Sequence, residues 1–382
     1  MAITSKLRTG SILLGLVLAS PLGCGDARFV ALDRKPERQA IFLHPGLLHA
    51  SKDLERMKEN VALKLEPWAA GYKQLAADPH SSATWELRGP FASVSRGPGE
   101  ESHIKELEED SNAAYQTALV WAITGDAAYA AKSVEILNAW SQALTEIVGS
   151  DAQLAAAYSG SKLVNAAEIL RYTYREWAPV DVEAFESILR DVFYPLITAP
   201  GDAGWGGASI KTSLGIGIFL NDRTIFEHAV DGFNNNACAS LTRYVGTTGQ
   251  PADGGHSQDS AQLGIGNLAE AAELAWHQGV DLYAGSDNRL LAGFEYVAKY
   301  NLGEAVPFSK GGSCTANYSS LSDVGRGKLR PIYEMAWNHY VNRVGIPAPF
   351  TQQAAAMIRP EGAAFSADHP GFGTLTFSLP AR

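Results

Sequence analysis

Apolar residues recur every three or four positions between residues 51 and 344, which is the period of an amphipathic α-helix. The first such segment begins at Ser51, a residue type favoured at helix N-caps, and places Leu54 and Met57 on one face. The same spacing predicts further helices over residues of about 112–123, 128–144, 154–175, 179–197, 208–220, 222–234, 259–278, 286–300 and 329–344. Because the breaks between them are short, consecutive helices are expected to pair as antiparallel hairpins.

Two segments depart from this helical pattern. Residues 78–110 are polar and marked by glycine and proline, and loops of that length inside compact domains are usually functional or disordered. Arg88 and Arg96 lie in this loop, where they either contact an anionic chain or are solvated. The tail 373–379 alternates apolar and hydroxyl residues and is compatible with one short strand.

The order of these elements predicts an all-α protein. No change in composition marks a second domain, so residues 25–382 are expected to form a single one. Alanine-rich helix faces allow close approach between neighbours. Stacked hairpins of this kind form either an open superhelix or a closed α/α toroid, and periodicity does not distinguish the two.

The formal charge of the 382-residue chain limits its partners. A net charge of −10 excludes nucleic acid, whose phosphates need a basic face. The same charge disfavours an anionic polysaccharide over most of the surface. A site for such a polymer must therefore be a local basic pocket on an acidic body.

The first 24 residues have the pattern of an export signal. Lys6 and Arg8 precede an apolar run at 12–19 that is too short to span a bilayer. Cys24 follows Gly23, as in bacterial lipoprotein signals, in which the cysteine is acylated and becomes the first mature residue. We therefore expect an exported protein, either a periplasmic or outer-membrane-anchored lipoprotein or a secreted one, with no membrane contact beyond this anchor.

Chemistry-bearing side chains gather between residues 243 and 300. His256 lies in a glycine-rich polar run just before a predicted helix, and Asp253 and Asp259 flank it. A histidine and a tyrosine placed together can remove one proton and return another. The candidate proton donors are Tyr244, Tyr296 and Tyr300, and the candidate carboxylate binders are Gln258, Arg243 and Arg289. Asp259 is a further candidate for substrate binding; it either orients the His256 ring, forms an acid–base pair, or simply favours the helix N-terminus. Aromatic residues one helical turn apart are more often core residues, and the arginines have salt bridges as their alternative role.

Other motifs add less. Trp205 and Lys211 border a glycine-rich stretch, where they either line a sugar subsite or pack in the interior. Cys238 and Cys314 either pair as a disulfide or stay as isolated buried residues. No metal or cofactor is expected, because the chain has no phosphate-binding loop and no dinucleotide fingerprint. Four histidines lie in scaffold-like motifs whose spacing does not suit zinc: His44, His49, His277 and His339.

Taken in order along the chain, several motifs resemble the alginate-lyase-like polysaccharide lyases. They are His44-Pro-Gly-Leu-Leu-His49, Asp53-Leu-Glu-Arg-Met-Lys58, Glu66-Pro-Trp68, Asn112-Ala-Ala-Tyr-Gln116, Trp121-Ala-Ile-Thr-Gly-Asp126, Ile136-Leu-Asn-Ala-Trp-Ser141, Asn165-Ala-Ala-Glu-Ile-Leu-Arg171, Ala275-Trp-His-Gln-Gly279, Phe294-Glu-Tyr-Val-Ala-Lys-Tyr-Asn-Leu-Gly303 and Gly325-Arg-Gly-Lys-Leu-Arg-Pro-Ile-Tyr-Glu334. The resemblance covers nearly all of the expected mature chain.

This resemblance implies an (α/α) toroid and β-elimination on a uronate-containing polysaccharide of the alginate or glucuronan type. In that chemistry a polar group binds the uronate carboxylate, a His or Tyr removes the C5 proton, and a Tyr protonates the leaving oxygen. His256 is then the expected base, one of the three tyrosines above is the acid, and Gln258, Arg243 or Arg289 binds the carboxylate.

Two positions depart from the family pattern. Members commonly carry Arg-Asp-x-x-His before the Gln-Leu-Gly helix, where this chain has His256 and Ser260. They also often carry an asparagine beside the tryptophan that matches Trp205, where this chain has Gly204. Either His256 has taken over as base, or the catalytic machinery is reduced.

Two alternatives to a lyase remain open at this point. One is an (α/α)-toroid glycoside hydrolase that uses Asp253 and Asp259 as its carboxylate pair. The other is a glycan-binding protein that kept the fold and lost the chemistry. Fold alone does not decide between them, because function depends on the site.

Overall fold

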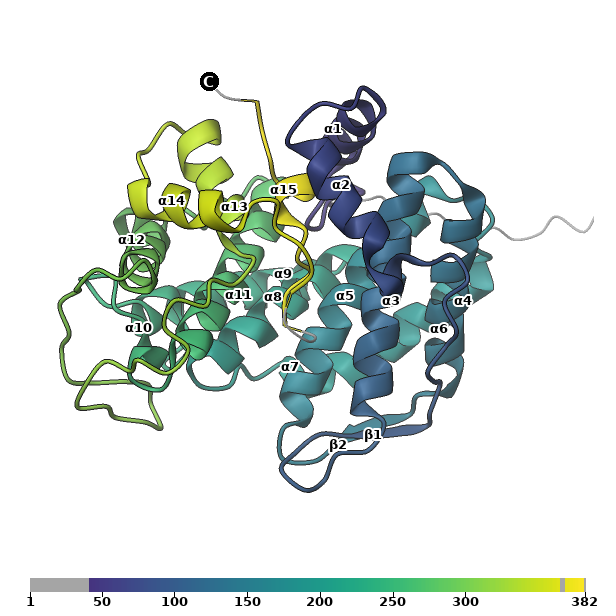
Figure 1. Cartoon of the computed structure of the whole chain (residues 1–382). Coiled ribbons are helices and arrows are strands. Elements are labelled where there is room, and N and C mark those ends of the chain that lie inside the picture. Colours follow the sequence, from purple (N-terminus) through teal and green to yellow (C-terminus); the bar gives the residue numbers. More distant parts are fainter. Residues whose placement is uncertain (1–40, 365–367, 381–382) are drawn as a thin grey trace, which may run out of the picture. The chain divides into compact units, whose positions relative to one another are not determined.

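A computed structural model describes residues 41–364 and 368–380, and Figure 1 shows the order of its elements. The expected export signal and Cys24 lie outside the described residues. The first half contains α1 (Ser51–Ala62), α2 (Trp68–Ala77), the 3-10 turn η1 (Pro79–Ser81), β1 (Ser93–Ser95), α3 (Ile104–Thr124), α4 (Ala127–Ala143), β2 (Glu146–Val148), α5 (Ala152–Thr173), α6 (Pro179–Ile188), the π-helical turn η2 (Leu189–Phe193) and α7 (Tyr194–Ile197).

The second half is again mainly helical. It contains α8 (Ala203–Phe219), α9 (Arg223–Asn235), α10 (Leu241–Tyr244), the 3-10 turn η3 (Ala252–Gly255), α11 (Gln258–His277), α12 (Gly285–Asn301), α13 (Tyr333–Trp337), the π-helical turn η4 (Asn338–Arg343), α14 (Pro349–Ile358) and α15 (Gly373–Thr376). In the described part of the chain, no helix has both the length and the apolar character needed to cross a bilayer.

The helices pair as predicted. α3 packs against α4, α8 against α9, and α11 against α12, while α5 packs against η2 and α7. A second set of contacts joins α3 to α5, α5 to α8 and α8 to α11, so these four helices form an inner layer and their partners an outer one. The strands β1 and β2 pair in parallel, with Val94 opposite Ile147.

The inner helices α5, α8 and α11 run in the same direction. At each interface, later residues of one helix contact later residues of its neighbour. Between α5 and α8 the pairs are Gly160 with Thr212 and Val164 with Gly215, and between α8 and α11 they are Gly204 with Gly264 and Lys211 with Glu270. All three helices therefore begin at the same end of the layer. The loops that precede them are gathered at that end.

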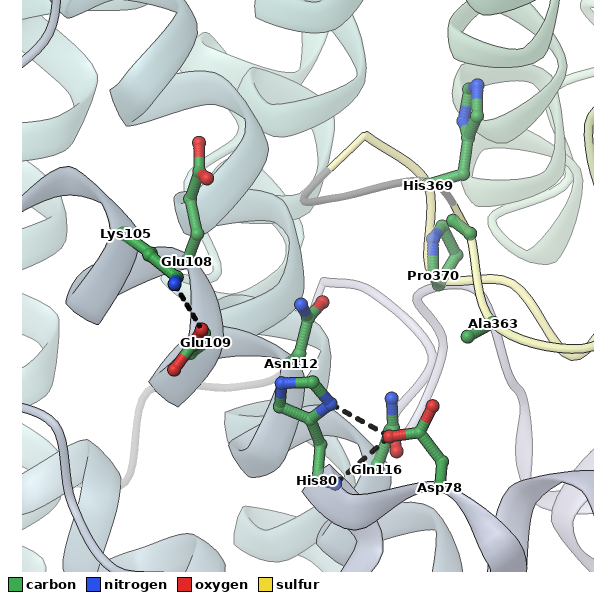
Figure 2. Close-up of a pocket in the computed structure, with 11 residues that line it drawn as sticks. Asp78, His80, Lys105, Glu108, Glu109, Asn112, Gln116, Ala363, His369 and Pro370 are labelled. Atoms are coloured by element: carbon green, nitrogen blue, oxygen red, sulfur yellow. Dashed lines mark hydrogen bonds and ion pairs between the residues drawn. The ribbon is translucent and has the colours of Figure 1, made fainter.

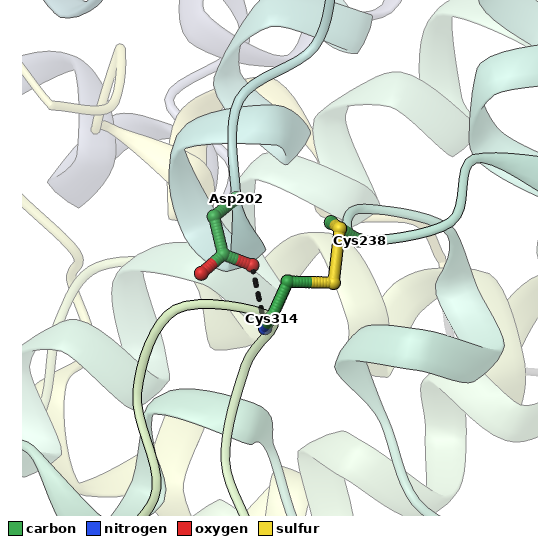
Figure 3. A group of neighbouring side chains, drawn as sticks. All are labelled: Asp202, Cys238 and Cys314. Carbon is green, nitrogen blue, oxygen red and sulfur yellow. Dashed lines mark hydrogen bonds between the residues drawn. A yellow bond between two sulfur atoms is a disulfide. The ribbon is translucent and has the colours of Figure 1, made fainter.

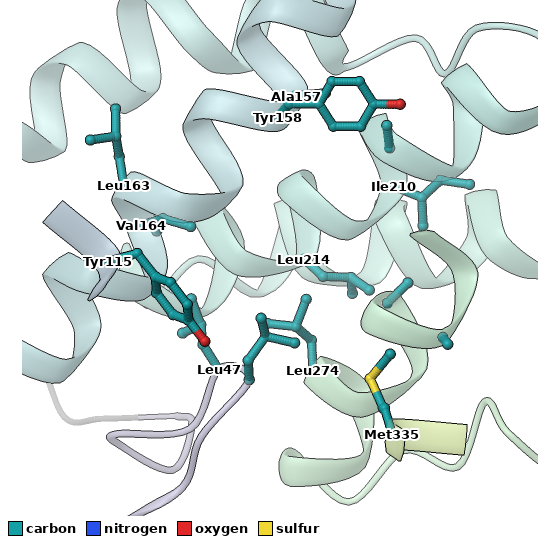
Figure 4. Packing of buried hydrophobic residues seen from close by; sticks show 14 of the residues in the cluster. Leu47, Tyr115, Ala157, Tyr158, Leu163, Val164, Ile210, Leu214, Leu274 and Met335 are labelled. Atoms are coloured by element: carbon teal, nitrogen blue, oxygen red, sulfur yellow. The ribbon is translucent and has the colours of Figure 1, made fainter. Parts of the chain in front are cut away.

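The core lies between these helices. Leu47 enters it from the N-terminal segment and meets side chains from α3, α5, α8 and α11, as Figure 4 shows. α8 is the most completely enclosed of these helices, because all of its residues except Trp205 are buried. Gly217 permits this enclosure, since a Cβ there would lie 2.7 Å from the backbone nitrogen of Phe226 in α9.

Histidines of the motif regions hold the scaffold together, as the sequence predicted. Their hydrogen bonds are His44 Nδ1 to Glu168 at 2.7 Å, His49 Nε2 to the Tyr115 hydroxyl at 2.6 Å, and His277 Nδ1 to the Leu47 carbonyl. The Nε2 atom of His277 also lies 3.0 Å from the carboxylate of Asp53. Burial lowers the pKa of His49 to about 4, so this ring is neutral at physiological pH.

Four element predictions need correction. The helix expected from residue 112 begins at Ile104, because Ile104 and Leu107 are buried among the acidic residues of its first turns, and the loop expected over 78–110 is shorter by the same amount. The helix expected from residue 208 begins at Ala203, because glycines hide its first turn from the apolar pattern but allow close packing there. The helix expected from residue 329 begins only at Tyr333. The tail that was compatible with a strand forms α15 instead, with its apolar and hydroxyl residues all buried and Thr374 hydrogen-bonded to Glu334.

A disulfide settles the alternatives for the two cysteines. Cys238, between α9 and α10, is bonded to Cys314 in the long loop 302–332, with 5.5 Å between their Cα atoms. Figure 3 shows Asp202 beside the pair, accepting a hydrogen bond from the Cys314 N–H. Because both sulfurs are in the disulfide, neither is a thiolate, and this trio of side chains is not a metal site.

We predict that Gly217→Ala lowers the free energy of unfolding by about 1–3 kcal/mol, because the new methyl group overlaps the α9 backbone. Chemical denaturation of both proteins measures the change. Gly232→Ala in α9 is the matched control, since its Cβ would meet nothing closer than 3.5 Å. That control is expected to be neutral or stabilising by up to about 1 kcal/mol. Equal effects at the two positions would contradict the proposed close approach.

The disulfide closes a loop over a sequence separation of 76 residues. We therefore predict that a reductant lowers the unfolding free energy by about 4 kcal/mol, the entropy of a loop of that length. Denaturation with and without dithiothreitol measures the effect. The double variant Cys238→Ser, Cys314→Ser should be as unstable as the reduced protein and should not respond to reductant. A wild-type protein that is indifferent to reductant would contradict the cross-link.

Candidate active site

A cavity of about 430 Å³ opens where α8 and α11 begin. Its walls come from the first turn of α8, from η3, from the start of α11 and from the loop 302–332. The residues that line it are Asp202, Ala203, Gly204, Trp205, Asp253, His256, Ser260, Leu263, Ser313, Thr315, Ala316 and Tyr318. We call it the His256 cavity.

His256 is exposed in this cavity, between η3 and α11. Ser257 caps α11, its hydroxyl accepting a hydrogen bond from the N–H of Ser260 at 3.0 Å. The Nδ1 atom of His256 lies 3.1 Å from the Ser260 hydroxyl. When Nδ1 carries the proton and donates it to this hydroxyl, Nε2 is free to accept a proton from a ligand.

Tyr318 lies across the cavity from His256, with 6.4 Å between the ring centroids. It is half-buried on the loop 302–332, and its side chain packs against Gly255, where a Cβ would lie 2.2 Å from that of Tyr318. Burial and the nearby carboxylates of Asp253 and Asp202 raise the pKa of Tyr318, so its hydroxyl keeps its proton. A phenol and an imidazole in one cavity can act as an acid–base pair.

The two carboxylates of the cavity have different environments. Burial raises the pKa of Asp253, although the Gly204 N–H, 3.2 Å away, favours its ionised form. Asp202 is also partly buried, but hydrogen bonds from Ser313 and Thr315 outweigh that effect and lower its pKa. Asp202 is thus an ionised clamp that holds the loop of Tyr318 against the start of α8.

The structure brings three of the sequence candidates into this cavity: His256, Trp205 and Asp253. The side chain of Trp205 is 41% exposed and is available for stacking against a sugar ring. Asp259 does not line the cavity and lies 4.0 Å from the Nε of Arg330 instead. The Asp253–Asp259 pair considered for a hydrolase therefore does not share one cavity.

The three candidate tyrosines are buried outside the lining. The hydroxyl of Tyr244 donates to the carbonyls of Ser260 and Ala261, under the floor of the cavity. Two more hydroxyls are engaged elsewhere: Tyr296 donates to the carbonyl of Pro307 at 2.7 Å, and Tyr300 donates to Asp323 at 2.6 Å. Their hydrogen bonds are those of core residues.

The candidate carboxylate binders also lie outside the lining. Gln258 is buried and donates to the carbonyl of Ser322 at 2.9 Å. Arg243 donates to the carbonyl of Ala237 at 2.7 Å, and Arg289 to that of Val245 at 3.3 Å. Among the residues lining the His256 cavity, only His256 itself can become positively charged.

The basic candidates lie beside the inner helices. Lys211 is buried in α8 and donates to Glu270 at 2.8 Å. Arg96 lies 3.2 Å from Glu108, with its guanidinium over the ring of Tyr158. Arg88 is more exposed, stacks over Trp85 and lies 3.3 Å from Glu109.

A second cavity, of about 530 Å³, lies between η1, the first half of α3 and the segment that leads to α15 (Figure 2). His80 is on its wall, with Nδ1 2.8 Å from Asp78, and Glu108, Glu109 and Lys105 lie opposite. We call it the His80 cavity. It is larger than the His256 cavity, and its lining offers two histidines, a lysine, carboxylates and amides, but no tyrosine, to a ligand.

Sequence reasoning missed Tyr318, Asp202 and the two hydroxyl residues that bind it. Tyr318 lies in a polar loop without apolar periodicity, and nothing local to it indicates that the loop folds back over η3. The two cysteines were the available signal, because a disulfide between them fixes this loop beside Asp202.

Comparison with known proteins agrees with this architecture. A family model described as "Alginate lyase" matches residues 75–307. No curated protein matches the sequence significantly.

Among solved structures, an alginate lyase from Bacteroides ovatus superposes with a TM-score of 0.59 at 13% identity, covering 88% of this chain and 100% of that one. Alginate lyase A1-III from Sphingomonas species A1 gives 0.60 at 14% identity, with coverage of 86% and 95%. A histidine-to-alanine variant of alginate lyase A1-III complexed with tetrasaccharide gives 0.58 at 14% identity, with coverage of 87% and 97%.

At these identities the solved structures establish the fold. The hairpins of this chain form the (α/α) toroid expected from the sequence. The family model spans more than half of the chain, and the inner and outer helix layers match the fold of its structural neighbours. The chain belongs to the alginate lyase family of polysaccharide lyases.

Proposed function

We propose that this protein cleaves a uronate-containing polysaccharide, of the alginate or glucuronan type, by β-elimination in the His256 cavity. The observation that carries the proposal is the pairing of His256 with Tyr318 across one cavity in an alginate lyase fold. Trp205 beside them offers a stacking surface for a sugar ring.

The reaction follows from the protonation states of the pair. Nε2 of His256 takes the C5 proton of the uronate, and the electron pair left on C5 forms the C4=C5 double bond. The C4–O glycosidic bond breaks at the same time, and the Tyr318 hydroxyl gives its proton to the leaving oxygen. Each positioned group contributes roughly 10²–10⁴-fold, since it acts where charge moves in the transition state.

Tyr318 is a better acid in this proposal than the tyrosines named from the sequence. The hydroxyls of Tyr244, Tyr296 and Tyr300 are engaged in buried hydrogen bonds, whereas Tyr318 faces the cavity. Ser260 supports the base in place of the histidine that relatives commonly have there, because its hydroxyl orients the His256 ring. We further propose that the protein is exported, on the N-terminal pattern ending at Cys24.

We predict that purified protein produces ultraviolet absorbance of an unsaturated uronate on at least one polymer. The panel is mannuronan, guluronan, glucuronan and glycosaminoglycans, and the polymer that responds names the substrate. A saturated product carrying a water oxygen would indicate a hydrolase. Binding without any product, by protein shown to be folded, would indicate a glycan-binding protein and overturn the proposal.

We predict that His256→Ala and Tyr318→Phe each reduce kcat by roughly 10²–10⁴-fold, because each removes one proton-transfer group. Circular dichroism should show an unchanged helical fold in both variants. Tyr129→Phe, on the outer helix α4, is the matched control and should keep wild-type activity. Tyr296→Phe tests the competing acid, and a loss there with full activity in Tyr318→Phe would reject the assignment of Tyr318.

A further inference from the structure

The proposed reaction leaves the uronate carboxylate without a cationic partner in the His256 cavity. The cavity wall instead carries two carboxylates, Asp202 and Asp253. A polyuronate brings one negative charge for each sugar, so cations must meet it elsewhere along the cleft. A cluster of buried cations among the described residues would meet this requirement.

Such a cluster lies beside the inner helices. Lys162 of α5, Lys211 of α8 and Arg330, just before α13, are each less than a tenth exposed. We call these three residues the cationic cradle. Two of them stand on helices that are buried along most of their length, so their positions are fixed by the core.

A carboxylate of the chain itself occupies this cradle. Asp368 makes an ion pair with the guanidinium of Arg330, and its backbone carbonyl accepts a hydrogen bond from Lys211 at 3.2 Å. The Asp368 carboxylate is also the charge that acts most strongly on Lys162. The cradle is thus built for an anion, and the anion present comes from the C-terminal segment.

Other groups around the cradle are also held in place. Glu270 of α11 accepts from Lys211 at 2.8 Å and is hydrogen-bonded to His369, which holds the chain beside Asp368. The ring of Tyr158 lies beside Lys211, and its buried hydroxyl is acted on by Asp368, Asn267 and Arg330. The cradle is therefore lined by groups whose positions the core fixes.

The cradle is accessible through Asp368. The side chain of Asp368 is 17% exposed, and its neighbours His369 and Pro370 form a wall of the His80 cavity (Figure 2). If this side chain turns away, its place beside the Arg330 guanidinium can be taken by another carboxylate. The displaced side chain would then be solvated.

We propose that the cationic cradle is a binding subsite for a uronate carboxylate, which Asp368 occupies until the sugar displaces it. The identity of the ligand rests on the proposed function, while the geometry of the cradle does not. Substrate cannot enter the subsite while the Asp368 carboxylate fills it. The apparent affinity for substrate is therefore the intrinsic affinity multiplied by the fraction of time for which the subsite is open.

The test compares binding in two charge-matched variants, both in the His256→Ala background so that no turnover is needed. Asp368→Asn removes the occupant, and Asp323→Asn removes an exposed carboxylate that is likewise paired with an arginine, Arg326. Calorimetry measures the binding of tetrasaccharides of mannuronate and of glucuronate. We expect their affinity to rise roughly tenfold in Asp368→Asn, because a cradle that is open about a tenth of the time would then be open all of the time. Asp323→Asn should bind as the parent does.

Neutral cellotetraose separates a carboxylate subsite from general sugar binding and should show no gain. An unchanged affinity in Asp368→Asn, or an equal gain in both Asp→Asn variants, would overturn the proposal. If Asp368→Asn fails to fold, Lys162→Met in the same His256→Ala background decides the matter. It should lower the affinity for the uronate tetrasaccharides about tenfold, and full retention of affinity would refute the subsite.

These outcomes are independent of the activity assay. A gain in Asp368→Asn from a protein that cleaves no polymer would keep the subsite and reject the lyase. Cleavage without any gain would keep the lyase and reject the subsite.

Discussion

The enclosure of α8 is the constraint on which the remainder of the structure depends. This helix packs against α5, α9 and α11, and small residues at Gly207, Gly215 and Gly217 let those neighbours approach it closely. Close packing on every side leaves the helix no freedom to slide. The first turn of α8 is therefore fixed relative to the first turn of α11, and the wall formed by Gly204 and Trp205 is held opposite His256.

The proposed chemistry and the proposed charge recognition are divided between two places. Under the proposed function, the His256 cavity supplies a base, an acid and a stacking surface, and its wall also carries the carboxylates of Asp202 and Asp253. The proposed cationic cradle supplies buried positive charge from Lys162, Lys211 and Arg330. Together the two proposals account for how an acidic chain could accept an acidic polymer.

Much of the fold was predictable from local pattern. The helical hairpins could be predicted because each helix buries one stripe of apolar residues, and this stripe appears in the sequence as a helical period. Closure into a toroid was not visible in this way and came only from the resemblance to a family. The start of α8 was missed for a physical reason: Gly206 and Gly207 pack through their backbone, and such packing leaves no apolar pattern.

The site was less predictable than the fold. His256 could be found because a polar, glycine-rich run before a helix is unusual in an all-α chain. Tyr296 and Tyr300 looked equally promising, but helical spacing is the signature of packing, and both are buried. Tyr318 lies in a loop without helical periodicity. The position of this loop depends on a hydrogen bond from Ser313 to Asp202, more than 100 residues away in the sequence, and on the disulfide. Contacts of this range cannot be inferred from composition or spacing.

The common direction of α5, α8 and α11 has an electrostatic consequence. Each helix carries a partial positive charge of roughly half a unit at its N-terminus, from the aligned dipoles of its peptide groups. Gln153, at the start of α5, donates to the carbonyl of Ala199, just before α8, and Asp253, just before α11, accepts from Gly204. The N-termini of α8 and α11 therefore meet at the His256 cavity, with the N-terminus of α5 next to that of α8, and the backbone itself supplies a positive potential there that no substitution of a side chain can remove.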